Sequence, residues 1–282
     1  MRWTAGPRSS DLEDRRGQRM GGALPKLGIG GFLLLAILSF VFKTDFFALL
    51  GGGAATTNAP VEGGPVASSP EEEEMVKFVD FVQKDAQDVW TQTFAQDGQQ
   101  YPRAGLVLFR DATRSGCGIG QSAMGPFYCP ADQKVYIDLA FYQELQNRFG
   151  APGDFAQAYV IAHEVGHHVQ NVLGLSDQVR AAQQNDPSRA NELSVRLELQ
   201  ADCFAGVWAH STQQRDLLEK GDVEEALGAA AAVGDDRIQS QSGGGVNPET
   251  WTHGSAEERA RWFRRGLETG NIESCDTFQA RG

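Results

Sequence analysis

The residues with the clearest chemical potential are His163, Glu164 and His167, which form the pattern His-Glu-x-x-His. Positions four apart in an α-helix differ by about 40° around its axis, so both imidazoles would project from one face, one turn apart. Two imidazoles in that arrangement can bind one zinc ion. Glu164 is rotated by about 100° from His163, which is too far to share the metal but close enough to act on a water molecule beside it. The pattern therefore predicts two zinc ligands and a general base.

A catalytic zinc site also needs a third protein ligand and an open position for water. The class that uses a third histidine would require glycine at position 170 and histidine at 173, but the chain has Gln170 and Leu173. Glu198 and Asp202 are better candidates, because they share one face of a later helix among apolar residues. Two acidic groups there repel each other and are costly to bury, and a dication would offset both effects. We expect Glu198 to bind the metal and Asp202 to accept a hydrogen bond from a ligand histidine, which fixes its tautomer.

The remaining histidines differ in what their positions allow. His253 lies in a turn-like Thr-His-Gly-Ser segment before a helix, and it is the best candidate to stabilise an oxyanion. The alternative is an ordinary polar loop position. His168 faces about 100° away from His167, so we expect it either behind the metal ligands or on the surface. His210 lies twelve positions after Glu198, about 18 Å along a helix, and cannot share the metal.

Two long helices must position the candidate ligands. The first is expected from Asp154, a helix-starting residue after Pro-Gly, to Gly174, and the second over residues 188–210. Gly166 costs a helix about 1 kcal/mol relative to alanine, which indicates a packing or functional reason for it. Further helices are expected over 140–149, 221–232 and 256–267, and another begins at the four glutamates 71–74, which suit a helix N-terminus.

Strands are predicted before the helices. Residues 106–109 and 134–138 read as short buried strands, separated by a turn-rich segment over 115–125. Strands followed by helices indicate an α+β fold rather than an alternating parallel one. We therefore predict an α+β domain with a small sheet and active-site helices.

The N-terminal region resembles a membrane anchor. Residues 27–42 lack charges and are bounded by Lys26 and Lys43, and as a helix they would span about 24 Å, slightly less than the roughly 30 Å hydrocarbon core. The apolar residues 46–50 can extend this span. A cleaved signal peptide is the alternative, but the segment before the apolar run is long and residues 46–51 form a poor small-x-small cleavage site. The predicted organisation is a basic cytoplasmic segment (1–26), a transmembrane helix (27–50), a flexible Gly/Pro/Ser linker (51–70) and the metal-binding domain (71–282).

Charge and cysteine usage restrict the partners and the compartment. The net charge is −12, and it divides into +2 for residues 1–70 (7 basic, 5 acidic) and −14 for residues 71–282 (18 basic, 32 acidic). The acidic domain excludes nucleic acid as the main ligand. Basic residues gather before the apolar span, so the N-terminus is expected in the cytoplasm and the domain outside it, in the periplasm or at the cell surface. The four cysteines follow the span and predict two disulfides. The short loop between Cys117 and Cys129 suggests one pair, which leaves Cys203 with Cys275.

The His-Glu-x-x-His pattern followed by Glu198-x-x-x-Asp202 resembles the gluzincin branch of zinc peptidases. Over longer stretches the chain resembles the "putative neutral zinc metallopeptidase" family of membrane-anchored bacterial proteins. The likeness is carried by Asp-Leu-Glu-Asp-Arg-Arg-Gly at 11–17, Gly-Pro-Phe-Tyr-Cys-Pro at 125–130, Val-Tyr-Ile-Asp at 135–138 and the terminal helix. No departure occurs at the three ligand positions or at Glu164.

This resemblance implies a zincin-like fold, one Zn²⁺ and hydrolysis of a peptide or protein substrate, most simply as an endopeptidase. Glu164 would then act as general base and His253 would stabilise the oxyanion. In zincin-like folds an edge strand beside the active-site helix pairs with extended substrate, and residues 134–138 are the predicted strand nearest in sequence to that helix. An alternative is a zinc-binding module of the cell envelope without catalytic activity, although the presence of Glu164 favours the enzyme.

Overall fold

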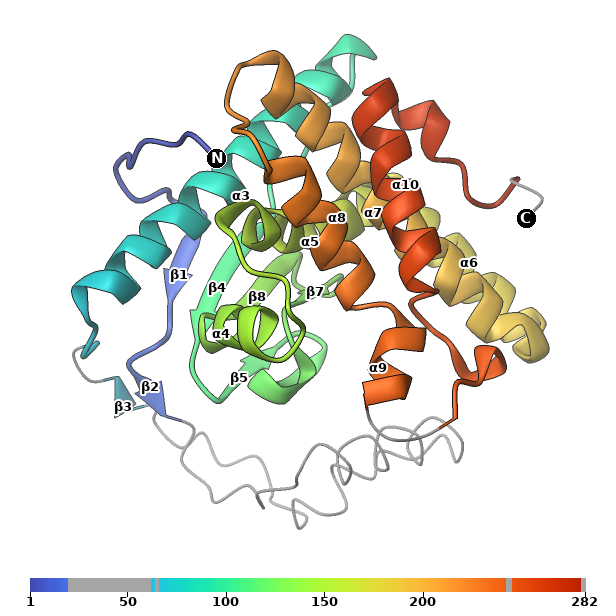
Figure 1. Cartoon of the computed structure of the whole chain (residues 1–282), viewed down its shortest axis with the longest axis horizontal. Coiled ribbons are helices and arrows are strands. Elements are labelled where there is room, and N and C mark those ends of the chain that lie inside the picture. The colour runs from blue at the N-terminus through green and yellow to red at the C-terminus, as the bar shows by residue number, and fades with distance from the viewer. Residues whose placement is uncertain (20–61, 64–65, 242–244, 280–282) are drawn as a thin grey trace.

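The structure is a computed structural model that describes residues 1–19, 62–63, 66–241 and 245–279 (Figure 1). The predicted transmembrane helix and most of the predicted linker lie outside these ranges. Within them, no helix combines the length and the apolar character that a membrane crossing requires.

A four-stranded mixed sheet forms the centre of the fold. Its order is β1 (Leu12–Asp14), β4 (Gly105–Phe109), β8 (Lys134–Asp138) and β7 (Phe127–Cys129). The first three strands are parallel, and β7 runs antiparallel to β8. Two short pairs flank the sheet: β2 (Gln18–Arg19) with β3 (Glu62–Gly63), and the hairpin of β5 (Ala112–Ser115) with β6 (Gly118–Gln121). The predicted strands at 106–109 and 134–138 are thus confirmed, and so is the α+β class.

The prediction that residues 134–138 form the edge strand beside the active-site helix is wrong. The strand at 134–138 is β8, which lies between β4 and β7, so both of its edges are already paired. The edge nearest the later helices is β7, which folds back onto β8 through a tight turn in which the Gln133 amide donates to the Cys129 carbonyl. A strand of three residues has too short an alternation to be recognised in the sequence.

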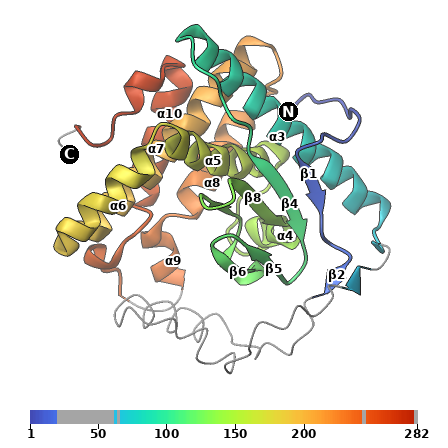
Figure 2. The same ribbon diagram turned by 180° about the vertical axis from the view of Figure 1, so that it is seen from behind.

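The helices lie above and beside this sheet as it is drawn in Figures 1 and 2. They are α3 (Pro70–Gln96), α4 (Ala140–Asn147), α5 (Asp154–Val172), α6 (Leu175–Asn185), α7 (Ala190–Gln214), α8 (Asp222–Ala232), α9 (Asp235–Gln241) and α10 (Ala256–Thr269). Short 3₁₀ turns lie at Ser122–Met124, Pro187–Arg189, Pro248–Thr250 and η4 (Ile272–Cys275). The six predicted helices are present, whereas α6 and α9 were not predicted.

Local sequence explains where several helices begin and end. Ser69 caps α3 by accepting a hydrogen bond from the Glu72 amide, and acidic residues occupy the first turn. Ser255 and Glu258 form a reciprocal capping box at the start of α10, and Gly270 ends that helix with a φ of 58°. Gly174, with a φ of 74°, separates α5 from α6.

Helix α5 lies at the centre of the helical layer and packs against α3, α7 and α8. Its contact with α7 is close at Gly166, where an added Cβ would lie 2.9 Å from the Ala201 carbonyl oxygen. Phe155 of α5 also stacks on Trp208 of α7, with ring centroids 5.5 Å apart and both side chains fully buried. Gly166 therefore allows close packing of α5 on α7, which explains why the helix contains a residue with low helix propensity.

The N-terminal residues belong to the folded unit, although the sequence analysis begins the domain at residue 71. Strand β1 pairs with β4, with Leu12 opposite Leu106. Arg16 is 3% exposed and forms ion pairs with Asp14 and Glu73 at 2.7 and 2.8 Å. The Met1 ammonium group also forms an ion pair, 2.7 Å from Asp154 at the start of α5. Residues 1–19 therefore lie against the domain.

Both predicted disulfides are present. One joins Cys117 to Cys129, and the other joins Cys203 of α7 to Cys275 of η4. The described chain contains no free cysteine. The second bridge attaches the C-terminal segment to the helix that carries Glu198.

Candidate metal centre

The structure brings His163, His167 and Glu198 together. The two histidines lie one turn apart on α5, and Glu198 faces them from α7. The Nε2 atoms of His163 and His167 lie 3.2 and 3.4 Å from the two carboxylate oxygens of Glu198. One potential ligand atom from each residue lies within 4.8 Å of the other two. Two imidazole nitrogens and a carboxylate are a set of donors that catalytic zinc uses.

The outer nitrogens of both rings are already occupied, which favours metal binding at the inner ones. His163 Nδ1 donates to Asp202 Oδ1 at 2.8 Å, and His167 Nδ1 donates to Gln170 Oε1 at 2.9 Å. Each Nδ1 therefore carries a proton, and each Nε2 is the nitrogen available to a metal. The two Nε2 atoms and the Glu198 carboxylate are therefore suitable ligands for a zinc ion.

The electrostatics of the cluster depend on its carboxylates. Burial opposes a charged His163 ring, but Asp202 outweighs this and raises the pKa of His163 to about 10. Burial also opposes a charged Glu198, yet the two imidazoles hold the pKa of Glu198 well below its usual value. Because zinc binds neutral imidazole, metal binding would release the protons that Asp202 and Glu198 stabilise on the two imidazole rings.

Glu164 lies next to the cluster without belonging to it. Its side chain is buried at 7% exposure, and burial raises its pKa above the usual value for glutamate. Glu164 directly follows His163 on α5, and the charges of His163, His167 and Glu198 all influence its pKa. A buried carboxylate with a raised pKa is suited to accept and return a proton near neutral pH.

Asp202 lies in a buried network that extends beyond His163. It accepts hydrogen bonds from the Tyr159 hydroxyl and from Arg259, whose Nε and Nη2 atoms lie 2.8 and 3.0 Å from its two oxygens. Burial opposes its charge, but Arg259 lowers the pKa of Asp202. The contact of Asp202 with His163 was predicted from the sequence, whereas its contacts with Tyr159 and Arg259 were not. Arg259 lies on the terminal helix, and nothing in its local sequence distinguishes it from the other arginines there.

His253 lies between the 3₁₀ turn at Pro248–Thr250 and α10, outside the three-residue cluster, and its side chain is 49% exposed. Asp235 positions it: one carboxylate oxygen lies 3.1 Å from His253 Nδ1, and the other accepts hydrogen bonds from the amides of Thr252, His253 and Gly254. Burial lowers the pKa of His253, but Asp235 and the charge of Glu198 together raise it above its usual value. Asp235 was missed because it belongs to α9, a seven-residue helix with little periodic signal.

His168 and His210 lie outside the cluster. His168 is fully buried rather than exposed; its Nε2 donates to the Pro102 carbonyl at 2.6 Å, and its Nδ1 accepts from the Tyr128 hydroxyl at 2.9 Å. It therefore holds strand β7 and the segment before β4 against α5. His210 Nδ1 donates to the Leu267 carbonyl at 2.8 Å, consistent with its exclusion from the metal site.

Gln170 is a further residue that the sequence analysis did not assign to the site. The lack of glycine at position 170 excludes the class with a third histidine ligand, but it does not indicate what Gln170 itself does. It follows His167 by three positions, a spacing that places two side chains close together on a helix. The three-residue spacing could have linked Gln170 to His167, but many pairs of residues in any helix share that spacing.

The donor set and its supporting contacts agree with a sequence comparison. Residues 1–278 match the family described as "Putative neutral zinc metallopeptidase". The chain belongs to this family. It is 49% identical to "Uncharacterized protein YpfJ" of Escherichia coli K12 over 99% of both chains. It is also 50% identical to "Uncharacterized protein Mb2605" of Mycobacterium bovis over 64% of each chain. No solved structure matches the present chain.

Proposed function

We propose that the protein is a zinc-dependent peptidase in which His163, His167 and Glu198 hold one Zn²⁺ and Glu164 is the general base. The observation that carries this proposal is the convergence of both Nε2 atoms on the Glu198 carboxylate, with the buried Glu164 beside them. Family membership supports the same assignment.

The chain's own residues supply the proton transfers and the positioning. When bound, zinc would supply Lewis acidity that polarises a peptide carbonyl and makes water a stronger nucleophile at neutral pH. Glu164 would accept the proton of the attacking water and deliver it to the leaving amine. Asp235 holds His253 Nδ1 and, together with Glu198, raises the pKa of the ring, so that a charged His253 would donate from Nε2 to the developing oxyanion.

Strand β7 is the best candidate to align an extended peptide substrate. It forms the edge of the four-stranded sheet and contacts α5. Tyr128 of β7 connects this edge to the active-site helix, because its hydroxyl donates to His168 and accepts from Asn171 at 3.1 Å. Addition of a substrate strand to this edge would position a peptide bond near the ligands. The proposed partner is therefore a peptide or an extended segment of a protein.

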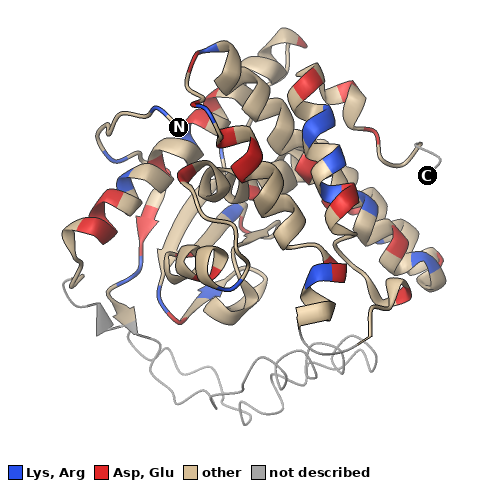
Figure 3. Cartoon of the chain, viewed as in Figure 1, with Lys and Arg blue, Asp and Glu red and all other residues tan. Residues whose placement is uncertain are grey.

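We propose that the folded domain lies outside the cytoplasm, in the periplasm or at the cell surface. Its two disulfides support this location, because such bonds persist in oxidising compartments. Membrane association through residues 27–50 is part of the same proposal. The proposal also leaves out nucleic acid as the main ligand, because residues 71–282 carry a net charge of −14 (18 basic, 32 acidic). Figure 3 shows acidic and basic positions mixed along the helices.

Zinc content and peptide cleavage together test the proposed function. The purified wild-type chain is expected to contain about one zinc per molecule by elemental analysis and to cleave members of a broad peptide library. Glu164→Gln should retain the zinc and lose cleavage, whereas Glu268→Gln, an exposed glutamate on α10, should behave as wild type. Zinc without cleavage by the wild type would favour the zinc-binding module. Absence of zinc would overturn the proposal.

A further inference from the structure

The two candidate ligand histidines are supported in different ways. His163 donates to a carboxylate, Asp202, which can only accept hydrogen bonds when charged. His167 donates to a neutral amide, Gln170. An amide can present either its oxygen or its nitrogen, so some other contact must hold the Gln170 oxygen toward His167.

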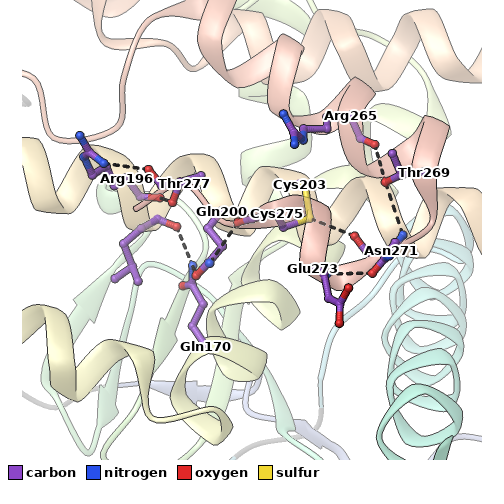
Figure 4. Close-up of a disulfide and its surroundings, with 11 residues drawn as sticks. Gln170, Arg196, Gln200, Cys203, Arg265, Thr269, Asn271, Glu273, Cys275 and Thr277 are labelled. Atoms are coloured by element: carbon purple, nitrogen blue, oxygen red, sulfur yellow. Dashed lines mark hydrogen bonds between the residues drawn. A yellow bond between two sulfur atoms is a disulfide. The ribbon is translucent and has the colours of Figure 1, made fainter. Parts of the chain in front are cut away.

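That contact is a chain of hydrogen bonds that ends at backbone carbonyls (Figure 4). The Cys275 carbonyl can only accept, and it receives Gln200 Nε2 at 3.1 Å. The Gln200 oxygen is therefore directed toward Gln170, whose Nε2 donates to it at 3.1 Å. Gln170 Nε2 also donates to the Leu197 carbonyl at 2.7 Å. With its nitrogen used in this way, Gln170 must present Oε1 to His167.

Burial makes the direction of this chain energetically important. Gln170 is fully buried and Gln200 is 5% exposed. If Gln170 were reversed, its oxygen would face the Leu197 carbonyl and its NH₂ group would face His167 Nδ1. The Gln170 oxygen and the Leu197 carbonyl oxygen would then lie opposite each other without a proton between them, and two buried acceptors would be left unsatisfied. The observed direction leaves the proton on His167 Nδ1 and frees Nε2 for a metal.

A covalent bond holds the outer end of the chain in place. Cys275 is joined to Cys203, which lies on α7 three positions after Gln200. The same segment is held by Arg196, whose Nη1 donates to the Thr277 carbonyl at 2.9 Å (Figure 4). It also donates to the Phe278 carbonyl at 2.9 Å. The disulfide thus keeps the Cys275 carbonyl beside the Gln200 amide.

We propose that Gln170 and Gln200 are positioning residues for the metal, and that the Cys203–Cys275 disulfide anchors them. The relay from the Cys275 carbonyl through Gln200 and Gln170 selects the His167 tautomer whose Nε2 can bind zinc. This inference deepens the proposed function, because it concerns the same metal site. The hydrogen-bond chain can nevertheless be tested without zinc or substrate.

Side-chain variants test the relay through zinc affinity, measured by competition with a chromogenic chelator. Gln170→Leu removes the acceptor for His167 and is expected to weaken zinc binding about 10- to 100-fold. Gln200→Leu, which touches no ligand, should weaken it in the same direction by at least about threefold. Gln170→Glu restores an acceptor and should bind zinc more tightly than Gln170→Leu.

The matched control is Gln87→Leu, which removes another fully buried amide, on α3. Wild-type affinity in Gln200→Leu would overturn the relay.

Disulfide variants test the anchor. Paired replacement of Cys203 and Cys275 by serine should weaken zinc binding at least about threefold, whereas the same replacement of Cys117 and Cys129 should not change it. In the metal-free protein, NMR should show faster exchange of the Gln170 and Gln200 side-chain amide protons in the first variant only. Equal effects of the two paired replacements would show that the anchor has no specific role. If the wild type binds no zinc, the proposed function fails, and the exchange measurement still decides the relay.

Discussion

Asp202 combines two requirements of the site in one side chain. It fixes the orientation of His163 through Nδ1, and it balances the charge of Arg259, which is 3% exposed. Removal of its charge therefore affects both the metal site and the fold. A buried ion pair that loses one partner leaves an uncompensated charge, which is more costly than the loss of a surface pair.

Asp202→Asn is expected to weaken zinc binding about 10- to 100-fold and to lower the free energy of unfolding by about 3 kcal/mol. The cause is the loss of charge beside His163 and Arg259, with little change in volume. Chelator competition and chemical denaturation of the metal-free protein would measure the two effects separately. Asp88→Asn is a suitable control, because Asp88 forms exposed pairs with Lys84 and Arg103. Unchanged zinc affinity in Asp202→Asn would contradict the assigned role.

His253→Ala tests the oxyanion role under the proposed function. It is expected to reduce kcat about 100- to 1000-fold with a small change in KM, since the hydrogen bond to the oxyanion forms in the transition state. Zinc content should stay at the wild-type level, because His253 lies outside the three-residue cluster. Asp235→Asn should reduce kcat less, as it disturbs the position of His253 without removing it. A raised KM with an unchanged kcat would assign His253 to substrate binding instead.

At the scale of elements, the site exists because α5 and α7 approach each other closely. The ligands come from both helices, so their separation sets the distance between the imidazoles and Glu198. Gly166 permits this approach, since an added Cβ would lie 2.9 Å from the Ala201 carbonyl oxygen and 3.2 Å from its Cα. Helix α10 packs against the other side of α7 and brings Arg259 to Asp202.

Gly166→Ala is expected to push α5 away from α7 and to destabilise the fold by about 1–3 kcal/mol, although alanine favours the helix itself. Zinc affinity should fall as well, because the ligand helices separate. Gly228→Ala on α8 is the matched control: no atom lies within 4 Å of its added Cβ, so it should stabilise the protein by about 0.5–1 kcal/mol. Thermal denaturation with and without zinc would measure both variants. Stabilisation by Gly166→Ala would show that the close contact is not required.

At the scale of the whole molecule, the position of residues 1–19 bears on membrane topology. Strand β1 pairs with β4, and β2 pairs with β3 (Figures 1 and 2). A single membrane crossing within residues 27–50 would place β1 and β4 on opposite sides, so that crossing and this pairing cannot coexist in one molecule. From the pairing, we expect residues 1–19 and the domain to lie on the same side of the membrane.

Cysteine labelling can decide this topology. Gly6→Cys and Asn147→Cys each add one exposed thiol, in the N-terminal segment and on α4 respectively, to a chain whose four native cysteines are paired. A membrane-impermeant maleimide applied to cells with a permeabilised outer envelope is expected to label both variants, because the domain is proposed to lie outside the cytoplasm and β1 pairs with it. Labelling of neither variant would place both segments in the cytoplasm and overturn the proposed location. Labelling of Asn147→Cys alone would instead support the single crossing with a cytoplasmic N-terminus.

The sequence determined the local features of this protein, because those depend on residues a few positions apart. Helical spacing placed His163 and His167 on one face and paired Glu198 with Asp202. Apolar spacing together with helix-start and helix-end residues located six of the helices, and short apolar runs located the strands β4 and β8. Short elements such as β1, β7 and α9 contain too few residues for a periodic signal, so they were missed or misplaced.

Only the tertiary structure decided which distant residues support the site. Arg259, Asp235 and Gln200 contact or orient the candidate site residues from α10, α9 and α7, and Gln170 became meaningful once its partners were known. Their roles depend on how helices pack against one another, and no spacing along the chain encodes that packing. The same reason explains the edge position of β7 and the place of residues 1–19, since strand order in a sheet is a property of the whole fold.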